Sequence, residues 1–464
     1  MEERLDELST KDRQELRNIR TLLWGSNDVE QTIFQRWSQG FEFSELEPSA
    51  LVQCQGGPCA VIAPVQAFLL KILLMDTPGY SFYDLTADKC RTVLIQAICN
   101  ILMKCKETKY RIVTLRATDD AHEGTPSDVV DAARVNSAET GESPSSPAPG
   151  QVPEASDSQP GTWDPDQFHE RLTIKDMESI DEVEKFYMEN HSLLSGQYGV
   201  LLFLYSVLVT KGIENVVQEL NDTSEPLIHG TYGYGSQGLI NLMLTGRAVA
   251  HVWDNDEDVG GLKLRGINQQ SDIGFITTME QMRYCTVGSF YKNPKNPVWV
   301  MASETHLSVL FSTEKRLVSP ETPSEIARRV FKSYDPEGNN FIPSVVLQDV
   351  LCTLDLVSDK EYVDIMRSKL DPENLGIILL NGFMDEFFPQ EKRSMPDTFV
   401  LWHYNGIPGS NFGNKVKYSR GVAILLESDL KLMCNISNPM LMCLQTKWPN
   451  IEVNWQEMRT PSLN

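Results

Sequence analysis

Hydrophobic and polar positions recur with helical spacing over much of the first half of the chain. Residues 1–23 predict a charged helix, and residues 167–250 read as mainly helical. Within them, residues 198–210 (YGVLLFLYSVLVT) form an apolar run. This run is shorter than the roughly 20 residues that cross a bilayer, so it predicts a buried helix. Ser236 precedes the apolar stretch Gln237–Leu244 and is placed to cap that helix.

A period of two residues replaces the helical period near residue 297. Residues 297–312 (PVWVMASETHLSVLFS) alternate apolar and polar positions and carry the strongest strand pattern in the chain. Shorter strand patterns follow at 398–404, 421–427 and 450–455, while residues 324–390 return to helix. These patterns predict an α+β fold that carries an inserted helical unit near residues 320–390.

The segment from about residue 117 to 166 breaks both patterns. It contains SAETGESPSSPAPGQVPEASDSQPG, which is rich in Ser, Pro, Gly and acidic residues. Such a segment buries too little apolar surface to offset the entropy of ordering, so we predict a disordered insertion. The insertion lies inside the chain, and the folded segments on both sides of it are expected to share one domain.

Composition and charge restrict the classes of partner. The 464 residues are 41% hydrophobic, and 41 Lys and Arg against 64 Asp and Glu give a net charge of −23. Phosphate-backbone binding needs clustered basic residues, so we expect no nucleic-acid partner. The charge permits a basic protein partner, although solubility alone also accounts for it.

Cysteine usage and the first residues indicate the compartment. The first 20 residues have no apolar region of the secretory type, and no run is long enough to predict a membrane partner. The cysteine count of nine is odd, and no paired CxxC motifs suggest a zinc site. We therefore expect free thiols in a reducing compartment, the cytoplasm or the nucleus, with no metal and no cofactor.

One cysteine stands where a loop becomes a helix. Residues 53–70 read QCQGGPCAVIAPVQAFLL, with a Gly-Gly-Pro turn directly before Cys59. At a helix start, free amide groups and the positive dipole end lower a thiol pKa and can hold an oxyanion. Gln53 on the incoming loop is a candidate second oxyanion donor. A buried structural thiol remains the alternative, and Cys54 is the nearest rival nucleophile.

A cysteine nucleophile needs a base that is close in space. His306 lies on the strongest strand pattern and is the preferred candidate, whereas His403 on the 398–404 pattern is its rival. Either histidine could instead be packed in the core. A third residue could orient the imidazole. Glu304 is a poor choice, because a neighbour on the same strand points alongside the ring, and the sequence does not identify this residue.

Further stretches of the chain resemble known binding motifs. Residues 335–346 (DPEGNNFIPSVV) and 371–382 (DPENLGIILLNG) resemble EF-hand loops, but both lack the acid at the twelfth position that closes a calcium site. They predict a calcium-free helix pair, with a calcium sensor as the weaker alternative. The glycine-rich segment 230–238 (GTYGYGSQG) lacks the GK[ST] of a nucleotide-binding loop and predicts a structural turn or a substrate-contacting loop.

Several long motifs resemble the MINDY family of deubiquitinases. They are QGGPCAVIAPVQAFLLK, GVLLFLYSVLVTKGIENV, EPLIHGTYGYGSQGLINLMLTGRAVAHVWD, SETHLSVLFS and LQTKWPNIEVNW. The resemblance runs from about residue 23 to the C-terminus, outside the 117–166 insertion. It is strongest to the branch with an EF-hand-like insertion.

The resemblance implies a fold, an activity and a set of site residues. The fold is that of papain-like cysteine peptidases, and the activity is hydrolysis of polyubiquitin linked through ubiquitin's lysine forty-eight. Cys59 is then the nucleophile, His306 the general base and Gln53 the oxyanion donor. The partners are ubiquitin and its lysine-forty-eight-linked chains. The alternative is an inactive ubiquitin-binding scaffold on the same fold.

The resemblance and the patterns together divide the chain. A catalytic domain in two parts is expected on either side of the insertion. The expected boundaries are 1–23 (N-terminal helix), 24–116 (first part, with the nucleophile), 117–166 (disordered insertion), 167–319 (second part, with the base), 320–390 (EF-hand-like unit) and 391–464 (C-terminal strands packed on the catalytic domain).

Overall fold

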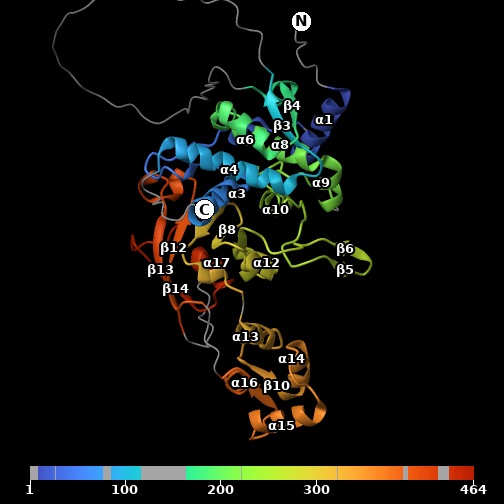
Figure 1. Ribbon diagram of the computed structural model, residues 1–464, viewed down its shortest axis with the longest axis vertical. Coiled ribbons are helices and arrows are strands. Elements are labelled where there is room, and N and C mark those ends of the chain that lie inside the picture. The colour runs from blue at the N-terminus through green and yellow to red at the C-terminus, as the bar shows by residue number, and fades with distance from the viewer. Residues whose placement is uncertain are drawn as a thin grey trace, which may run out of the picture.

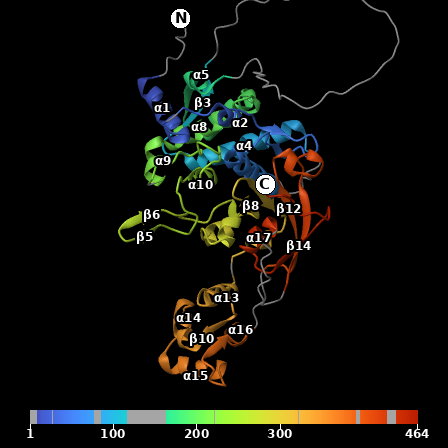
Figure 2. The same cartoon turned by 180° about the vertical axis from the view of Figure 1, so that it is seen from behind.

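The computed structural model places a helical layer above a mixed sheet, with a small helical unit below the sheet (Figure 1). The view from behind shows the same order (Figure 2). The structure describes residues 9–26, 28–76, 85–116, 163–220, 222–320, 322–389, 395–426 and 438–464.

Ten α-helices come from the parts of the chain before residue 246 that the structure describes, and a π-helical segment, Ile72–Asp76, continues α3. Their bounds are α1 Thr10–Trp24, α2 Gln31–Trp37, α3 Cys59–Lys71, α4 Ala87–Cys105, α5 Pro165–Glu170, α6 Ile180–Glu189, α7 Ser192–Ser195, α8 Gly199–Lys211, α9 Ile213–Leu220 and α10 Gln237–Thr245. The predicted helix at 1–23 is confirmed over Thr10–Trp24 as α1, and its residues 1–8 lie outside the described residues. The predicted buried helix at 198–210 is confirmed as α8. The hydroxyl of Ser236 accepts a hydrogen bond from the amide of Leu239 at 3.3 Å, so this residue caps α10 as predicted.

Within the described residues, no single helix is both long and apolar enough to cross a membrane, and only the bent pair α8 and α9 reaches that length and composition together.

A two-stranded ribbon joins the chain across the predicted insertion. Strand β3 (Tyr110–Leu115) pairs antiparallel with β4 (Leu172–Met177). The expectation that residues 167–250 are mainly helical is therefore wrong at β4, because a ladder to β3 satisfies its backbone groups. The insertion also ends earlier than predicted, since Asp164 caps α5 with a capping box. The rest of the predicted disordered segment, 117–162, lies outside the described residues.

The central sheet has six strands in the order β14-β13-β12-β9-β8-β7. Strands β7 and β8 are parallel, and the other pairs are antiparallel. The strands predicted at 398–404, 421–427 and 450–455 are confirmed as β12, β13 and β14. The bounds are β7 Gly274–Thr277, β8 Val298–Ala302, β9 Leu307–Phe311, β12 Thr398–Tyr404, β13 Ser419–Leu425 and β14 Ile451–Trp455.

The strand pattern at 297–312 contains a hairpin and not one continuous strand. Strands β8 and β9 pair with Ala302 opposite Leu307, and the turn between them includes His306. The amide of Ser303 donates to the carbonyl of His306 at 3.0 Å and closes this turn. The base candidate therefore precedes β9, at the end of the sheet.

Helix α3 covers one face of the sheet. Its residues share a core with Leu307, Val309 and Phe311 of β9. The opposite face carries Trp299 and Leu310, which pack with α17 and its neighbours in a second core. This alternation along β9 is what a strand buried on both faces requires. Shorter elements complete this body: β1 Glu42–Phe43, β2 Leu51–Val52, β5 Glu257–Val259, β6 Leu262–Leu264, α11 Thr278–Gln281, α12 Ser289–Lys292 and α17 Pro439–Gln445.

The lower unit has a hydrophobic core of its own. Two helix pairs surround a short antiparallel ribbon in which Ile342 lies opposite Ile378. The Asp335 carboxylate accepts two backbone amides of its own loop, and the Asp371 carboxylate does the same. The bounds are α13 Pro323–Ser333, β10 Phe341–Pro343, α14 Leu347–Thr353, α15 Lys360–Leu370, β11 Ile377–Leu379 and α16 Leu380–Phe387.

Candidate active site

Cys59 is the first residue of α3, so the predicted position at a loop-to-helix junction is confirmed. Pro58 precedes it as the N-cap residue and offers no side-chain hydrogen bond to the helix start. The first amides of α3 are therefore not capped by that side chain. This location suits an oxyanion site, because amides of a first turn point out of the helix end.

The Cys59 thiol is covered, and its environment differs from the expectation. The residue is 3% exposed, and its Sγ lies 3.7 Å from the carbonyl oxygen of Gly57. Burial raises the pKa of the thiol to about 11, although backbone hydrogen bonds, chiefly at Leu307, oppose the rise. The expectation of a lowered pKa at the helix start is therefore wrong for this conformation. Loss of solvation outweighs the helix dipole and the amides when the thiol is shielded from water.

His306 approaches the same place from the sheet. The backbone of Leu307, the next residue in the chain, lies close enough to the Cys59 thiol to lower its pKa. The imidazole is 5% exposed, and burial lowers its pKa to about 4. Its Nδ1 is buried and has no hydrogen-bond partner among the described residues. At neutral pH the ring is therefore uncharged and carries one unused nitrogen, as a general base requires.

Asn405 supplies the third group that the sequence did not identify. It follows β12, and its Oδ1 lies 3.0 Å from Nε2 of His306. Because a carbonyl oxygen only accepts, Nε2 carries the hydrogen and Nδ1 carries the lone pair. The only signal in the sequence was the position of Asn405 after a strand pattern. That signal gains meaning once β12 is known to pair with β9.

The rival histidine is held inside the sheet. His403 lies on β12 opposite Leu310, and its Nε2 is 2.9 Å from the hydroxyl of Ser308. Burial lowers the pKa of His403 to about 3. Glu304 shares the turn with His306 but has no hydrogen bond to it among those of the described residues.

Gln53 is brought to the site by its backbone. Its amide donates to the carbonyl of Gly406 at 2.8 Å, directly after Asn405 in the chain. The side-chain amide, however, donates to the carbonyl of Gln55 at 2.7 Å. In this arrangement the amide that would hold an oxyanion is already occupied by its own loop.

The glycine-rich segment 230–238 packs against the loop that precedes Cys59. Gly57 has φ +129°, and a Cβ there would lie 3.0 Å from the carbonyl oxygen of Gly233. A Cβ on Gly235 would lie 2.3 Å from the Cβ of Ala60. Glycine is needed at both positions for this close approach. Trp37 strengthens the contact, since its indole donates to the carbonyl of Gly233 at 2.9 Å.

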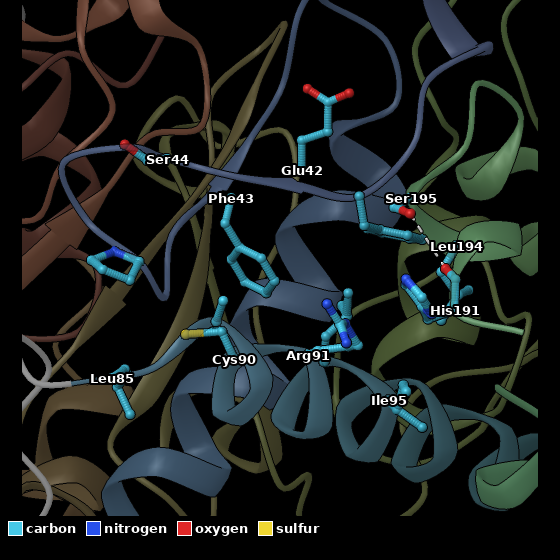
Figure 3. A pocket seen from close by; sticks show the side chains of 14 residues that line it. Glu42, Phe43, Ser44, Leu85, Cys90, Arg91, Ile95, His191, Leu194 and Ser195 are labelled. Carbon is cyan, nitrogen blue, oxygen red and sulfur yellow. Dashed lines mark hydrogen bonds between the residues drawn. The ribbon is translucent and has the colours of Figure 1, made fainter. Parts of the chain in front are cut away.

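A separate cavity of about 670 Å³ lies between β1, the start of α4 and the α7 turn (Figure 3). Apolar side chains such as Phe43 and Leu194 line it, together with Arg91 and His191. None of the candidate residues Gln53, Cys59 and His306 lines this cavity. Among the described residues, no cluster of three or more His, Cys, Asp and Glu side chains could hold a metal ion.

Comparison with known sequences assigns the chain to a protein family. The family described as "Deubiquitinating enzyme MINDY-3/4, conserved domain" matches residues 20–136 and 151–331. The chain belongs to the MINDY family. The resemblance seen in its motifs is thereby confirmed.

Named relatives extend the match over nearly the whole chain. A "Ubiquitin carboxyl-terminal hydrolase MINDY-3 homolog" of Drosophila melanogaster is 60% identical over 98% of this chain and 84% of its own length. The proteins named "Ubiquitin carboxyl-terminal hydrolase MINDY-3" from Danio rerio and Homo sapiens are each 46% identical. They match 96% and 97% of this chain and 98% and 99% of their own lengths. No solved structure matches this chain.

Proposed function

We propose that this MINDY protein is a cysteine-type deubiquitinase that hydrolyses isopeptide bonds in lysine-forty-eight-linked polyubiquitin. One observation carries the proposal. The turn that holds His306 leads directly into Leu307, whose backbone lowers the pKa of the Cys59 thiol, while Oδ1 of Asn405 lies 3.0 Å from the far nitrogen of the imidazole. Cys59, His306 and Asn405, from distant segments, thus supply the thiol, imidazole and orienting amide of a cysteine hydrolase. Nδ1 of His306 forms no hydrogen bond to the sulfur in this conformation, so the proposed chemistry requires the two atoms to approach when substrate binds.

The residues divide the chemistry into two halves. The Cys59 sulfur attacks the carbonyl of ubiquitin's C-terminal glycine, and Nδ1 of His306 takes the thiol proton. The oxyanion is held by the amide at the start of α3 and by Gln53. The imidazolium then protonates the departing lysine amine, the C–N bond breaks, and a thioester remains.

Hydrolysis of the thioester restores the enzyme. His306 removes a proton from water, the hydroxide adds to the carbonyl carbon, and the carbon–sulfur bond breaks. Ubiquitin leaves with a free carboxylate, and the sulfur regains its proton. Asn405 holds the ring in one orientation throughout, because Nε2–H donates to its Oδ1.

The resting arrangement needs a local change before this chemistry. Both the covered thiol, with its raised pKa, and the amide of Gln53 bonded to Gln55 must be released. Bound ubiquitin is the natural source of the free energy for that release, because binding interactions can offset local rearrangement.

The surrounding architecture is part of the proposal. The helical layer with Cys59 and the sheet with His306 correspond to the two halves of a papain-like peptidase. The unit from α13 to α16 corresponds to an EF-hand-like insertion without calcium. Its first-position carboxylates, Asp335 and Asp371, accept backbone amides, and the twelfth positions are Val346 and Gly382. Calorimetric titration with calcium is expected to give no binding heat, and a saturable signal contradicts this part.

A ubiquitin probe with a C-terminal electrophile tests the activity. The intact protein should form a covalent adduct, and Cys59→Ala should form none, while Cys54→Ala should be labelled as well as the intact protein. The rival function is a ubiquitin-binding scaffold without activity, which the covered thiol favours. Tight ubiquitin binding with no adduct, and no cleavage of chains, would establish the scaffold instead.

Linkage preference and charge steering need their own measurements. A panel of diubiquitins of every linkage should show the fastest cleavage for the lysine-forty-eight-linked dimer. The net charge of −23 is expected to attract the basic face of ubiquitin, so kcat/KM should fall as salt rises. A response that is flat from low to physiological salt contradicts the steering.

A further inference from the structure

Three residues near the C-terminus contact Asn405 and the turn that carries His306. They are Ser462, Leu463 and Asn464, called here the 462–464 segment. The carbonyl of Ser462 accepts a hydrogen bond from Nδ2 of Asn405 at 3.1 Å. The segment therefore reaches the residue that orients His306.

The same segment also contacts the turn that carries His306. The hydroxyl of Ser303 donates a hydrogen bond to Oδ1 of Asn464, and the hydroxyl of Thr305 lies 3.4 Å from the same oxygen. The Ser303 hydroxyl in turn accepts the backbone amide of His306 at 3.1 Å. One short segment thus bridges two turns that are about a hundred residues apart in the chain.

Burial of one side chain keeps the segment in place. Leu463 is 3% exposed and belongs to the core on the α17 side of the sheet. An internal bond from the Ser462 hydroxyl to the Asn464 carbonyl, 2.6 Å long, holds the flanking residues in a tight bend. Core burial of a leucine side chain typically stabilises its segment far more than one exposed hydrogen bond does.

The contacts have a chemical consequence for the base. The Ser462 carbonyl can bond only the NH₂ end of the Asn405 amide, and the amide N–H of Ile407 bonds its oxygen end at 3.0 Å. The oxygen end therefore faces His306, which places the ring hydrogen on Nε2 and leaves the lone pair on Nδ1. A carboxamide turned the other way would present a donor and favour the opposite tautomer.

We propose that the 462–464 segment is a positioning element that sets the orientation of Asn405 and thereby the reactive tautomer of His306. This inference rests on the proposed cysteine hydrolase chemistry. The segment acts through other groups, so it is not itself catalytic. Losing it should lower kcat more than it changes KM, because the base is misplaced while the ubiquitin-binding surface is kept.

Kinetics on the full chain test the proposal with lysine-forty-eight-linked diubiquitin as substrate. Leu463→Asp, which expels the segment from the core, should lower kcat about tenfold or more with KM within about twofold. Asn464→Ala should lower kcat by about threefold. Leu463→Met should retain most of the parent activity, and Met458→Asp should leave kcat and KM unchanged, since Met458 is 97% exposed. Unchanged kcat in a folded Leu463→Asp protein overturns the proposal.

A spectroscopic readout separates positioning from folding and from the proposed function. Nitrogen NMR of ¹⁵N-histidine-labelled protein reports the tautomer of His306, assigned by its loss in His306→Gln. The intact protein should show the Nε2–H form, and Asn464→Ala should add a fraction of the other form. A single unchanged tautomer in Asn464→Ala and in Leu463→Asp overturns the inference, whether or not the protein cleaves ubiquitin. Failure of the proposed function appears separately, as absence of labelling by the ubiquitin probe.

Discussion

Alkylation of the free protein tests the covered thiol directly. A thiol with a pKa of about 11 is about 0.1% ionised at pH 8, whereas one at the reference value of 9.0 is about 10% ionised. The thiolate is the reacting species, so ionisation alone slows Cys59 about a hundredfold. Its 3% exposure slows it further.

The assay compares two cysteines within one molecule. Cys352 is exposed and serves as the internal reference. After timed exposure to iodoacetamide, peptide mass spectrometry should find Cys352 modified at least about a hundred times faster than Cys59. In denaturant the two rates should converge, which controls for peptide detection. The rate at Cys59 should still be rising with pH at pH 9.

The reasoning fails on one clear result. If Cys59 of the folded, substrate-free protein reacts as fast as Cys352, with a rate that levels off below pH 8, its thiol is ionised at rest. The helix start would then outweigh burial, and the original expectation from the sequence would stand. If the contrast is observed, covalent labelling by the ubiquitin probe must depend on bound ubiquitin.

Three other substitutions probe the site and the fold. Asn405→Ala should lower kcat by about 10- to 100-fold, because His306 loses its orienting bond, while the exposed Asn381→Ala should retain full activity in the same assay. Glu47 is 3% exposed, and burial raises its pKa from 4.5 to about 7, so the folded state holds the proton more tightly than the unfolded chain. The unfolding free energy should therefore fall as pH rises from about 4.5 to about 7 and then level off. In urea titrations, Glu47→Gln should remove this pH dependence and raise the unfolding free energy by about 2–3 kcal/mol at pH 8. An unchanged pH dependence in the variant would mean that other groups cause it. Gly246→Ala should lower the unfolding free energy by about 2–4 kcal/mol, because φ is +77° and the new Cβ would lie 2.1 Å from the carbonyl oxygen of Lys104. The control Gly409→Ala places its Cβ in open space and should have the Tm of the parent protein.

Local patterns predicted the elements whose residues carry their own signal. The loop-to-helix junction at Cys59, the buried helix α8 and the cap at Ser236 follow from spacing and from turn chemistry. Strand β4 was missed because its burial depends on pairing with β3 across the insertion. The turn within 297–312 was missed because SETH interrupts the alternation without glycine or proline.

In the candidate site, too, some residues could be predicted from the sequence and others only from the tertiary structure. Cys59, His306 and Gln53 could be chosen from the sequence because their residue types and neighbours match a known chemistry. Asn405 could not, since an asparagine after a strand is common, and its role depends on which strand lies beside β12. The pKa of the thiol was predicted with the wrong sign, because the sequence reveals the helix start and not the amount of water that reaches it.

The sequence by itself determined the family, the position of Cys59 at the start of α3, and most of the strands that build the sheet, because these features depend on contiguous residues and their spacing. Only the tertiary structure decided which groups surround that sulfur. The order β12-β9-β8 brings Asn405 to His306 and lets the 462–464 segment contact both Asn405 and the turn that carries His306. Burial, and with it the protonation of Cys59 and His306, is a property of the packed chain, because the solvation of an ionisable group depends on residues far away in the sequence.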